Sequence, residues 1–188
     1  GLKYIGDAEF ISFCDSDDIW LPNKLERQLE IFHQNPMIDV LGGAFNSKPL
    51  RIGFKLITEL HRGTVKEMLI RNYPQPSTVL MRANVYHELG GFDERQRYAE
   101  DGNYFLQVAY KYNLYYLPEL LITYGFGKRG FGDSGLSGNL KGMYEGNIKN
   151  LKDLKSLGYI SSTFYSVMRV YHLIKYLRRL FITKLSRV

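Results

Sequence analysis

Cysteine is almost absent from this sequence, since Cys14 is the only one among 188 residues. A disulfide framework is therefore excluded, and we expect a reducing compartment with Cys14 inside a buried strand. Long hydrophobic runs are also missing, because no stretch approaches the ~20 apolar residues that a helix needs to cross a bilayer. The start of the chain has no signal-peptide pattern. Together these absences predict a cytoplasmic protein.

Other missing features limit the kinds of site and partner that this chain is expected to have. The four histidines have no metal-ligand spacing, so each is expected to be solvated or packed. A complete P-loop is missing, as is a G-x-G-x-x-G after a strand, which argues against an ATPase or a dehydrogenase. Acids are scarce in residues 151–188, where Asp153 is the only one among many Lys and Arg. In a chain of net charge +6, this asymmetry predicts an anionic partner for the tail, either a membrane surface or nucleic acid.

The most informative stretch is Phe10–Leu21, F-I-S-F-C-D-S-D-D-I-W-L. Its first half is β-prone and apolar, which favours a strand buried on both faces of a sheet. If extended backbone continues to Asp17, then Asp15 and Asp17 leave on one side, at the carboxyl end where open α/β sheets bind ligands. Two such carboxylates repel each other unless a cation joins them, and oxygen ligands favour Mg²⁺ or Mn²⁺. The alternative is that Asp17 or Asp18 only caps the following helix.

The rest of the chain alternates helices and strands up to a helical tail. Thr64 and Glu67 have the spacing of a capping box. Gly90 is placed to close a helix. Helices are expected at Pro22–His33, Asn84–Leu89 and Gly102–Tyr112, and strands at Met37–Phe45, Ser77–Arg82, Tyr115–Leu117 and Leu120–Tyr124. With 45% hydrophobic residues, the composition predicts one domain, residues 1–140, followed by a helical, basic, amphipathic tail, residues 141–188.

A second acidic segment follows the first at a distance. The sequence D-S-D-D-I-W-L-P-N-K-L stands at Asp15–Leu25, and L-G-G-F-D-E at Leu89–Glu94 precedes A-E-D at Ala99–Asp101. In order and spacing, these segments resemble the D-x-D and downstream motifs of the family 2 glycosyltransferases, nucleotide-sugar enzymes of the GT-A fold. A D-x-D alone is a weak signal, whereas the pair is fairly specific. The resemblance covers the chain from Gly1 to about Ser137.

The resemblance implies a partial α/β fold of the GT-A kind, a Rossmann-like α/β/α arrangement with a helical C-terminal tail. In the family, base-binding strands and helices precede the D-x-D strand, so this chain is expected to lack its N-terminal nucleotide-binding part. Asp17, helped by Asp15, would hold Mn²⁺ or Mg²⁺ against the donor diphosphate. Asp101 matches the family's general base and Glu100 its neighbour. Without the resemblance, both would be interpreted as dipole partners at a helix start.

Further site residues are expected around these acids. Lys128 and Arg129 lie in the glycine-rich segment Gly125–Asn139, which would be either a lid that orders over the diphosphate or a plain surface loop. Some relatives supply a metal-binding His here, and this segment has none. The family's acceptor side includes the positions of Ser77 and Thr78. Trp20 lies near the acids and packs either on a sugar face or as a core or interface anchor.

The expected reaction is transfer of one sugar with inversion. One base and no carboxylate nucleophile imply a single displacement, and the Q-x-x-R-W motif of the family's polymerases is missing. The expected partners are a nucleotide-diphosphate sugar and a glycan or lipid-linked acceptor, in bacterial cell-surface polysaccharide or glycan synthesis. A sugar nucleotidyltransferase and a non-catalytic sugar-binding or membrane-associated module remain as alternatives.

The C-terminal segment Ser162–Val188 carries two stripes. We expect it to lie on an anionic membrane, on the inner face of the plasma membrane, rather than to bind nucleic acid. The alternatives are packing on the domain's own core or on a second subunit, as in a homodimer. The predicted apolar stripe is Phe164, Met168, Tyr171, Ile174, Leu177, Phe181 and Leu185, and the predicted basic stripe is Arg169, His172, Lys175 and Arg179.

Overall fold

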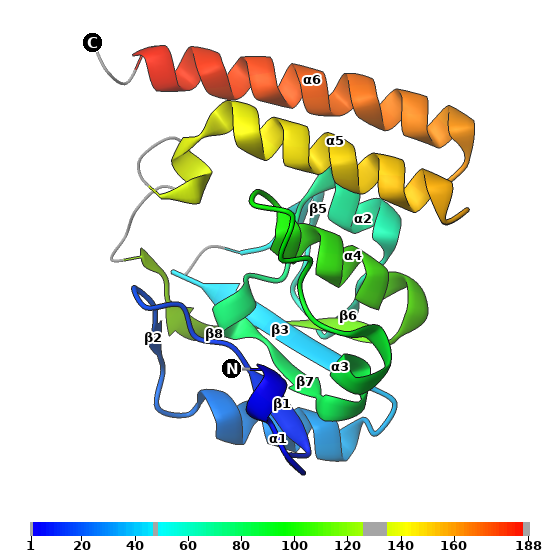
Figure 1. The fold of residues 1–188 in the computed structure, drawn as a ribbon. Coiled ribbons are helices and arrows are strands. Elements are labelled where there is room, and N and C mark those ends of the chain that lie inside the picture. The colour runs from blue at the N-terminus through cyan, green and yellow to red at the C-terminus, as the bar shows by residue number, and fades with distance from the viewer. Residues whose placement is uncertain (1, 47–48, 126–134, 186–188) are drawn as a thin grey trace. The chain divides into compact units, whose positions relative to one another are not determined.

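The computed structural model describes residues 2–46, 49–125 and 135–185 (Figure 1). The chain forms two compact units. The first contains Gly1–Gly91 and Phe105–Gly127, and the second contains Phe92–Tyr104 and Lys128–Val188. Phe92–Tyr104, which contains Asp101, thus belongs to the same unit as the C-terminal helices. The sequence prediction of one domain, residues 1–140, followed by a helical tail stays a prediction.

The first unit is built on a mixed sheet with the strand order β1-β7-β3-β8-β2, and β6 also pairs with β8. The central pair β3 and β8 is parallel, and the other pairs are antiparallel. A separate ribbon pairs β4 with β5. The strands are β1 Phe10–Ser12, β2 Ile19–Trp20, β3 Val40–Phe45, β4 Arg51–Ile52, β5 Lys55–Leu56, β6 His61–Arg62, β7 Leu80–Arg82 and β8 Leu114–Thr123.

The helices occupy the segments between and after these strands. They are α1 Lys24–Gln34, α2 Val65–Ile70, α3 Ala83–Leu89, α4 Glu100–Lys111, α5 Leu140–Ser156 and α6 Ser162–Leu185, with short 3-10 turns η1 Leu2–Tyr4, η2 Pro76–Thr78 and η4 Leu136–Gly138. Helix α4 begins in the second unit and ends in the first. No helix in the described ranges combines the length and the apolar character of a membrane span.

Apolar side chains of α1 pack against one face of the sheet. Phe32 and Leu41 are almost fully buried there. The amide of Gln28, also in α1, donates to the backbone oxygens of Leu41 and Thr78. This helix therefore fixes the position of the segment that leads into β7. Buried apolar residues of α1, of the sheet and of the segment between α1 and β3 form one core cluster, which consists of Ile31, Phe32, Ile38, Leu41, Leu80, Leu117, Leu121 and Ile122.

Several sequence predictions are confirmed. Thr64 and Glu67 form the expected capping box at α2. Gly90 ends α3 with a φ of 81°, a conformation that favours glycine because it has no Cβ. The helices predicted from apolar spacing correspond to α1, α3 and α4 within two residues at each end.

Other predictions are wrong in detail. The strands on either side of Pro118 are one strand, β8, whose pairing with β3 shifts register after Gly43. That irregularity accommodates Pro118, which has no N–H to give to a ladder. The strand expected over residues 9–14 is only β1, it lies at an edge of the sheet, and Cys14 is exposed.

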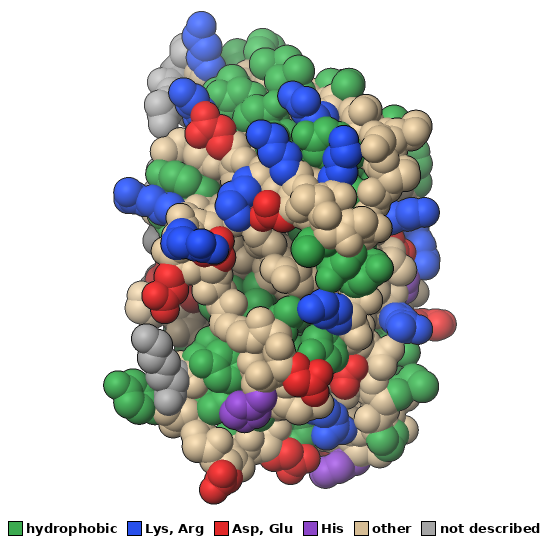
Figure 2. Space-filling view, turned by 45° about the vertical axis from the view of Figure 1, so that its right-hand side comes forward, with side chains coloured by type: hydrophobic (Ala, Val, Ile, Leu, Met, Phe, Trp, Pro, Cys, Tyr) green, Lys and Arg blue, Asp and Glu red, His purple; other side chains and the backbone are tan. Residues whose placement is uncertain are grey.

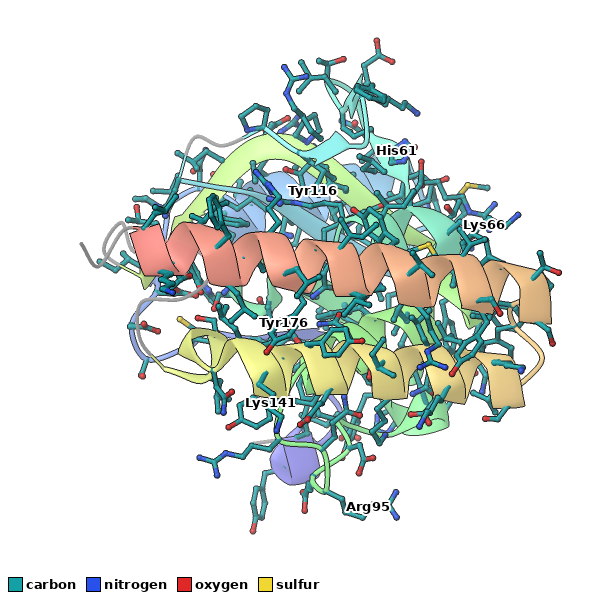
Figure 3. All side chains as sticks on the ribbon, turned by 90° about the horizontal axis from the view of Figure 1, so that it is seen from above. His61, Lys66, Arg95, Tyr116, Lys141 and Tyr176 are labelled. Carbon is teal, nitrogen blue, oxygen red and sulfur yellow. The ribbon has the colours of Figure 1, made fainter. Side chains whose placement is uncertain are left out.

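The second unit contains the helices α5 and α6, which lie side by side (Figures 1 and 3). Tyr176 of α6 points toward α5 and stacks on Tyr144, with 4.8 Å between ring centroids. Met168 and His172 are buried. The predicted stripes are therefore wrong in part. Met168 of the apolar stripe and His172 of the basic stripe lie on the buried side of α6, whereas the apolar residues Ile174, Leu177, Phe181 and Leu185 are exposed.

Candidate functional site

The first two acids of the D-x-D segment lie in a tight turn after β1. The backbone N–H of Asp18 donates to the backbone oxygen of Asp15 at 3.0 Å, so extended backbone does not continue to Asp17. Asp15 is exposed and Asp17 is half-buried. The strand alternation that predicted a common direction for Asp15 and Asp17 therefore does not apply.

Asp18, which the sequence assigned at most to a helix cap, is the buried acid of this turn. This residue is only 8% exposed. The Gln75 amide donates to one carboxylate oxygen at 2.8 Å, and the Gly125 N–H donates to the other at 2.9 Å. Helix α1 has Asn23 at its N-cap position instead. Asp18 thus joins three segments that are far apart in the sequence.

Gln75 connects the acids to each other. Its Nε2 also lies 3.5 Å from a carboxylate oxygen of Asp15. Its Oε1 is buried and has no hydrogen-bond partner among the described atoms. A buried acceptor without a donor is costly in a folded protein unless something else supplies the hydrogen bond. The amide of Gln75 therefore offers a neutral oxygen next to the acidic turn.

Ser77 and Thr78 do not face solvent, and their hydroxyls bond to the backbone of Asp15 and Gln75. Both are fully buried. Ser77 Oγ accepts a hydrogen bond from the Asp15 N–H at 2.9 Å, and Thr78 Oγ1 donates to the Gln75 backbone oxygen at 2.7 Å. Their hydroxyls are thus used within the chain, and their predicted place on the acceptor side remains a prediction.

Gly42 in β3 lets the Gln75 segment approach the sheet. A Cβ at this position would lie 2.2 Å from Pro74 Cβ, which is far inside van der Waals contact. The prolines at positions 74 and 76 restrict the backbone on both sides of Gln75. The sheet therefore determines where the Gln75 amide meets Asp15 and Asp18.

A buried lysine contacts the strand β1 that leads into the turn. Lys24 is 1% exposed, and its Nζ donates to Ser12 Oγ at 2.9 Å and lies 4.3 Å from the centre of the Trp20 ring. Burial lowers the pKa of Lys24 to about 8, and the nearby Cys14 thiol partly opposes this shift. Trp20 also donates from its indole N–H to Phe13 O at 3.2 Å. Trp20 packs against the core cluster, which is the core alternative left open by the sequence.

The second unit carries Glu100 and Asp101 at the start of α4, and both are half-buried. Asp101 Oδ1 accepts a hydrogen bond from the Gly102 N–H at 2.7 Å. The residue before them, Ala99, has a φ of 55°, which is uncommon for a residue with a Cβ. Such a conformation persists only where its surroundings enforce it.

Helix α5 provides that enforcement within the second unit. A Cβ on Gly146 would lie 2.2 Å from the Tyr98 backbone oxygen, and one on Gly142 would lie 2.6 Å from the Tyr98 ring. The Asn150 amide donates to Ala99 O at 2.9 Å. The small residues therefore allow the backbone before Asp101 to lie directly against α5.

A polar network extends this attachment. Asn150 Oδ1 accepts from the Gln96 amide at 2.7 Å, and Gln96 Oε1 accepts from both Asn103 at 2.9 Å and Lys149 at 2.8 Å. Asp153 accepts from Asn103 and Lys149. Gln96, Asn103 and Asn150 are all buried. A buried network in which each of these amides is bonded favours one arrangement of its members, and here it fixes the start of α4.

Comparison with solved structures now adds a relative in fold. S. aureus TarS, a glycosyltransferase, is similar over most of this chain. The structure of TarS 1–349 has a TM-score of 0.56 at 17% identity and covers 92% of this chain and 48% of its own. The same TarS segment in complex with UDP has a TM-score of 0.54 at 17% identity over the same shares. A further TarS structure has a TM-score of 0.58 at 16% identity and covers 96% of this chain and 30% of its own.

The chain thus spans less than half the length of each TarS chain. No family model and no curated protein matches the sequence. At this identity the likeness to TarS concerns the fold. The predicted α/β fold is confirmed, and it is the fold that this chain shares with the TarS structures.

The fold brings some of the predicted residues together. Asp15, Asp17, Ser77 and Thr78 belong to the first unit, where Asp15 contacts both Ser77 and Gln75, whereas Glu100 and Asp101 belong to the second unit. Lys128 and Arg129 lie outside the described residues. Sequence reasoning missed the roles of Asp18, Gln75 and Asn150. A signal for Gln75 was present, since a polar residue between two prolines has a restricted backbone on both sides.

The oxygen atoms at the turn are suitable ligands for a hard cation such as Mg²⁺. Among the described residues, no three His, Cys, Asp or Glu side chains are placed to hold a metal ion. Mg²⁺ is usually held by one or two carboxylates together with substrate phosphates and waters, so a complete protein cage is not required. The exposed Asp15 carboxylate, the half-buried Asp17 carboxylate and the unpaired Gln75 Oε1 are oxygen groups of the kind that coordinate such an ion or accept hydrogen bonds from its waters.

Proposed function

We propose that this chain forms part of a glycosyltransferase that moves one sugar from a nucleotide-diphosphate sugar to an acceptor hydroxyl with inversion. The observation that carries the proposal is the Asp15–Asp18 turn. Its buried acid is fixed by Gln75 and Gly125, while Asp15 stays exposed. The likeness in fold to TarS supports the same class of reaction, and the TarS complex with UDP supports a nucleotide-sugar donor.

Asp15 and Asp17 are the residues that would hold Mn²⁺ or Mg²⁺, with the Gln75 oxygen close to the same turn. When bound there, such an ion would neutralise the charge that develops on a diphosphate leaving group. Asp18 has a different part. Both of its oxygens already accept protein hydrogen bonds, so it holds the turn in shape.

Asp101 is the proposed general base. An acceptor hydroxyl is a weak nucleophile until its proton is removed as it attacks the anomeric carbon, and a carboxylate within hydrogen-bond reach can remove it. The attacking oxygen forms a bond to that carbon while the bond to the diphosphate breaks, which inverts the configuration. The bonds from α5 to Ala99 and Gln96 keep the start of α4, and hence Asp101, in place.

The test compares these acids in the full-length protein. Sugar transfer and donor binding are measured with a panel of uridine, guanosine and thymidine diphosphate sugars, with and without Mn²⁺. Asp17→Asn is expected to abolish the Mn²⁺-dependent part of donor binding. Asp101→Asn is expected to preserve donor binding and to lower transfer by about 10²–10⁴. Asp7→Asn, an exposed acid before β1, is the matched control and should change neither quantity.

Two results would contradict the proposal. Equal and mild effects of Asp17→Asn and Asp101→Asn on transfer would remove their separate roles. Release of pyrophosphate from a nucleoside triphosphate and a sugar phosphate, without transfer from any nucleotide sugar, would identify a nucleotidyltransferase instead. The anomeric configuration of the product, measured by NMR, tests inversion.

A further inference from the structure

Helix α6 carries a continuous apolar stripe that is open to solvent. We call it the outer stripe. Successive members are three or four residues apart, so they lie along one side of the helix. Their exposed fractions run from 53% to 65%. The outer stripe consists of Val167, Val170, Ile174, Leu177, Phe181 and Leu185.

The opposite side of α6 faces α5. Tyr165 lies over Lys155 of α5, with 4.8 Å from Nζ to the ring centre, and Tyr176 stacks on Tyr144. Met168 and His172 lie on the same side, between these two contacts, and are only 4% and 7% exposed. Successive residues are about 100° apart around the helix axis, so Ile174 and His172 point to nearly opposite sides of α6. The helix has therefore already buried one side against α5, and the outer stripe remains uncovered.

The charge on α6 has one sign. Its 24 residues contain no Asp or Glu. Figure 2 shows hydrophobic side chains gathered at the top of the view, where α6 lies, with Lys and Arg side chains bordering them. The basic residues are Arg169, Lys175, Arg178, Arg179 and Lys184.

We propose that α6 docks lengthwise on an anionic lipid surface through the outer stripe. A large exposed apolar patch with a polar border marks an interaction site. An amphipathic helix that lies in the interface buries its apolar side among the acyl chains, and its long basic side chains reach the lipid headgroups. On α6, Arg178 and Lys184 are exposed and lie beside the stripe, where they can make these contacts.

The observations favour lipid over a second copy of the chain. Exposed Tyr171, Leu173 and Leu180 widen the apolar surface beyond the outer stripe, whereas a two-helix seam uses a narrower stripe. A second α6 would also bring further cations to the seam and no acid to pair with them. An anionic surface is complementary to this charge pattern.

The test is flotation of the purified protein with two kinds of vesicle. One is phosphatidylcholine with phosphatidylglycerol, and the other is phosphatidylcholine alone. Binding is expected to the anionic vesicles only and should weaken as salt is added. Ile174→Asp with Phe181→Asp should abolish it. Arg178→Ala with Lys184→Ala should weaken it about 25-fold at low salt, since each basic residue near such a surface strengthens binding roughly fivefold.

The control is Lys55→Ala with Arg62→Ala, which removes the same charge from exposed positions outside α6. It should leave vesicle binding close to that of the parent. Circular dichroism checks that each variant keeps its helices. The proposal is overturned if the parent does not float with anionic vesicles, if it binds neutral vesicles equally well, or if light scattering shows a dimer that Ile174→Asp converts to monomer. Because these readouts need no sugar transfer, they are independent of the proposed reaction.

Discussion

Replacing Asp18 by alanine tests whether this acid holds the D-x-D turn in shape. The substitution removes both oxygens that accept from Gln75 and Gly125. It leaves two donors, one of them a backbone N–H, without their partner in a place that is 8% exposed in the parent. Loss of a donor's partner at such a position is more costly than loss of the same bond at the surface.

The magnitude follows from the two bonds. A hydrogen bond to a charged group contributes roughly 1.5–3 kcal/mol, so the two bonds together predict a loss of about 3–6 kcal/mol in the free energy of unfolding. In a protein of this size, that corresponds to a fall in Tm of roughly 10 °C. Asp7→Ala, the exposed control, should stay within about 0.5 kcal/mol of the parent.

A charge exchange between Asp18 and Gln75 makes the test specific. Gln75→Glu alone places a third carboxylate beside Asp15 and Asp18, and it should be destabilising because no donor remains between them. Adding Asp18→Asn restores one donor and one acceptor across the 2.8 Å contact. The double variant should therefore be more stable than Gln75→Glu, as measured by urea unfolding. Additive losses, or an Asp18→Ala no less stable than Asp7→Ala, would refute the reasoning.

Three further outcomes are expected. Burial lowers the pKa of Lys24 from 10.5 to about 8, so between these values the unfolded chain binds more protons, and the free energy of unfolding should rise with pH by at most about 1.4 kcal/mol per unit. Lys24→Met should remove that rise, seen in urea titrations from pH 8 to 9.5. Gly42→Ala forces a Cβ to within 2.2 Å of Pro74, and should cost about 1–3 kcal/mol and loosen the acidic turn. Gly146→Ala should cost a similar amount. Its Cβ would lie 2.2 Å from Tyr98 O, and the free-energy cost of that clash should exceed the ~1 kcal/mol that alanine gains over glycine in helix propensity.

Matched measurements keep these three predictions open to contradiction. Lys152→Ala, on the exposed side of α5, is the control for Gly146→Ala and should be close to neutral in thermal unfolding. Equal stability of both α5 variants would mean that Tyr98 can move away freely. For Lys24, a pH dependence that persists in Lys24→Met would assign it to other groups. A Gly42→Ala variant as stable as the parent would show that Pro74 yields without cost.

The sequence predicted the regular elements well wherever local chemistry decides them. The capping box of Thr64 and Glu67, the glycine that ends α3 and the apolar spacing of α1 each involve residues within one turn of each other. Such signals do not depend on the rest of the fold. The same holds for the α/β order, which follows from the alternation of helical and extended segments.

The candidate site was less predictable because tertiary contacts build it. Gln75 meets Asp18 across 57 positions of sequence, and Asn150 meets Ala99 across 51. The periodicity of apolar residues along the sequence does not predict such long-range polar pairs. The prediction for Asp15 and Asp17 assumed a longer strand, whereas the turn bond from Asp18 to Asp15 ends the extended backbone early. On α6, the apolar spacing was visible in sequence, but which side faces α5 was decided by packing.

The contact between Gly146 and Tyr98 predicts which residues should vary together among homologues. A helix that looks like a separate appendage in sequence carries two glycines, Gly142 and Gly146, whose lack of a side chain is required by a loop more than 40 positions earlier. The A-E-D segment and this Gly-x-x-x-Gly spacing should therefore descend together. Homologues that lose Gly142 are expected to have a smaller residue at position 98, because a Cβ on Gly142 would meet the Tyr98 ring. No change of side chain at position 98 makes the same room for Gly146, whose Cβ would meet the Tyr98 backbone oxygen.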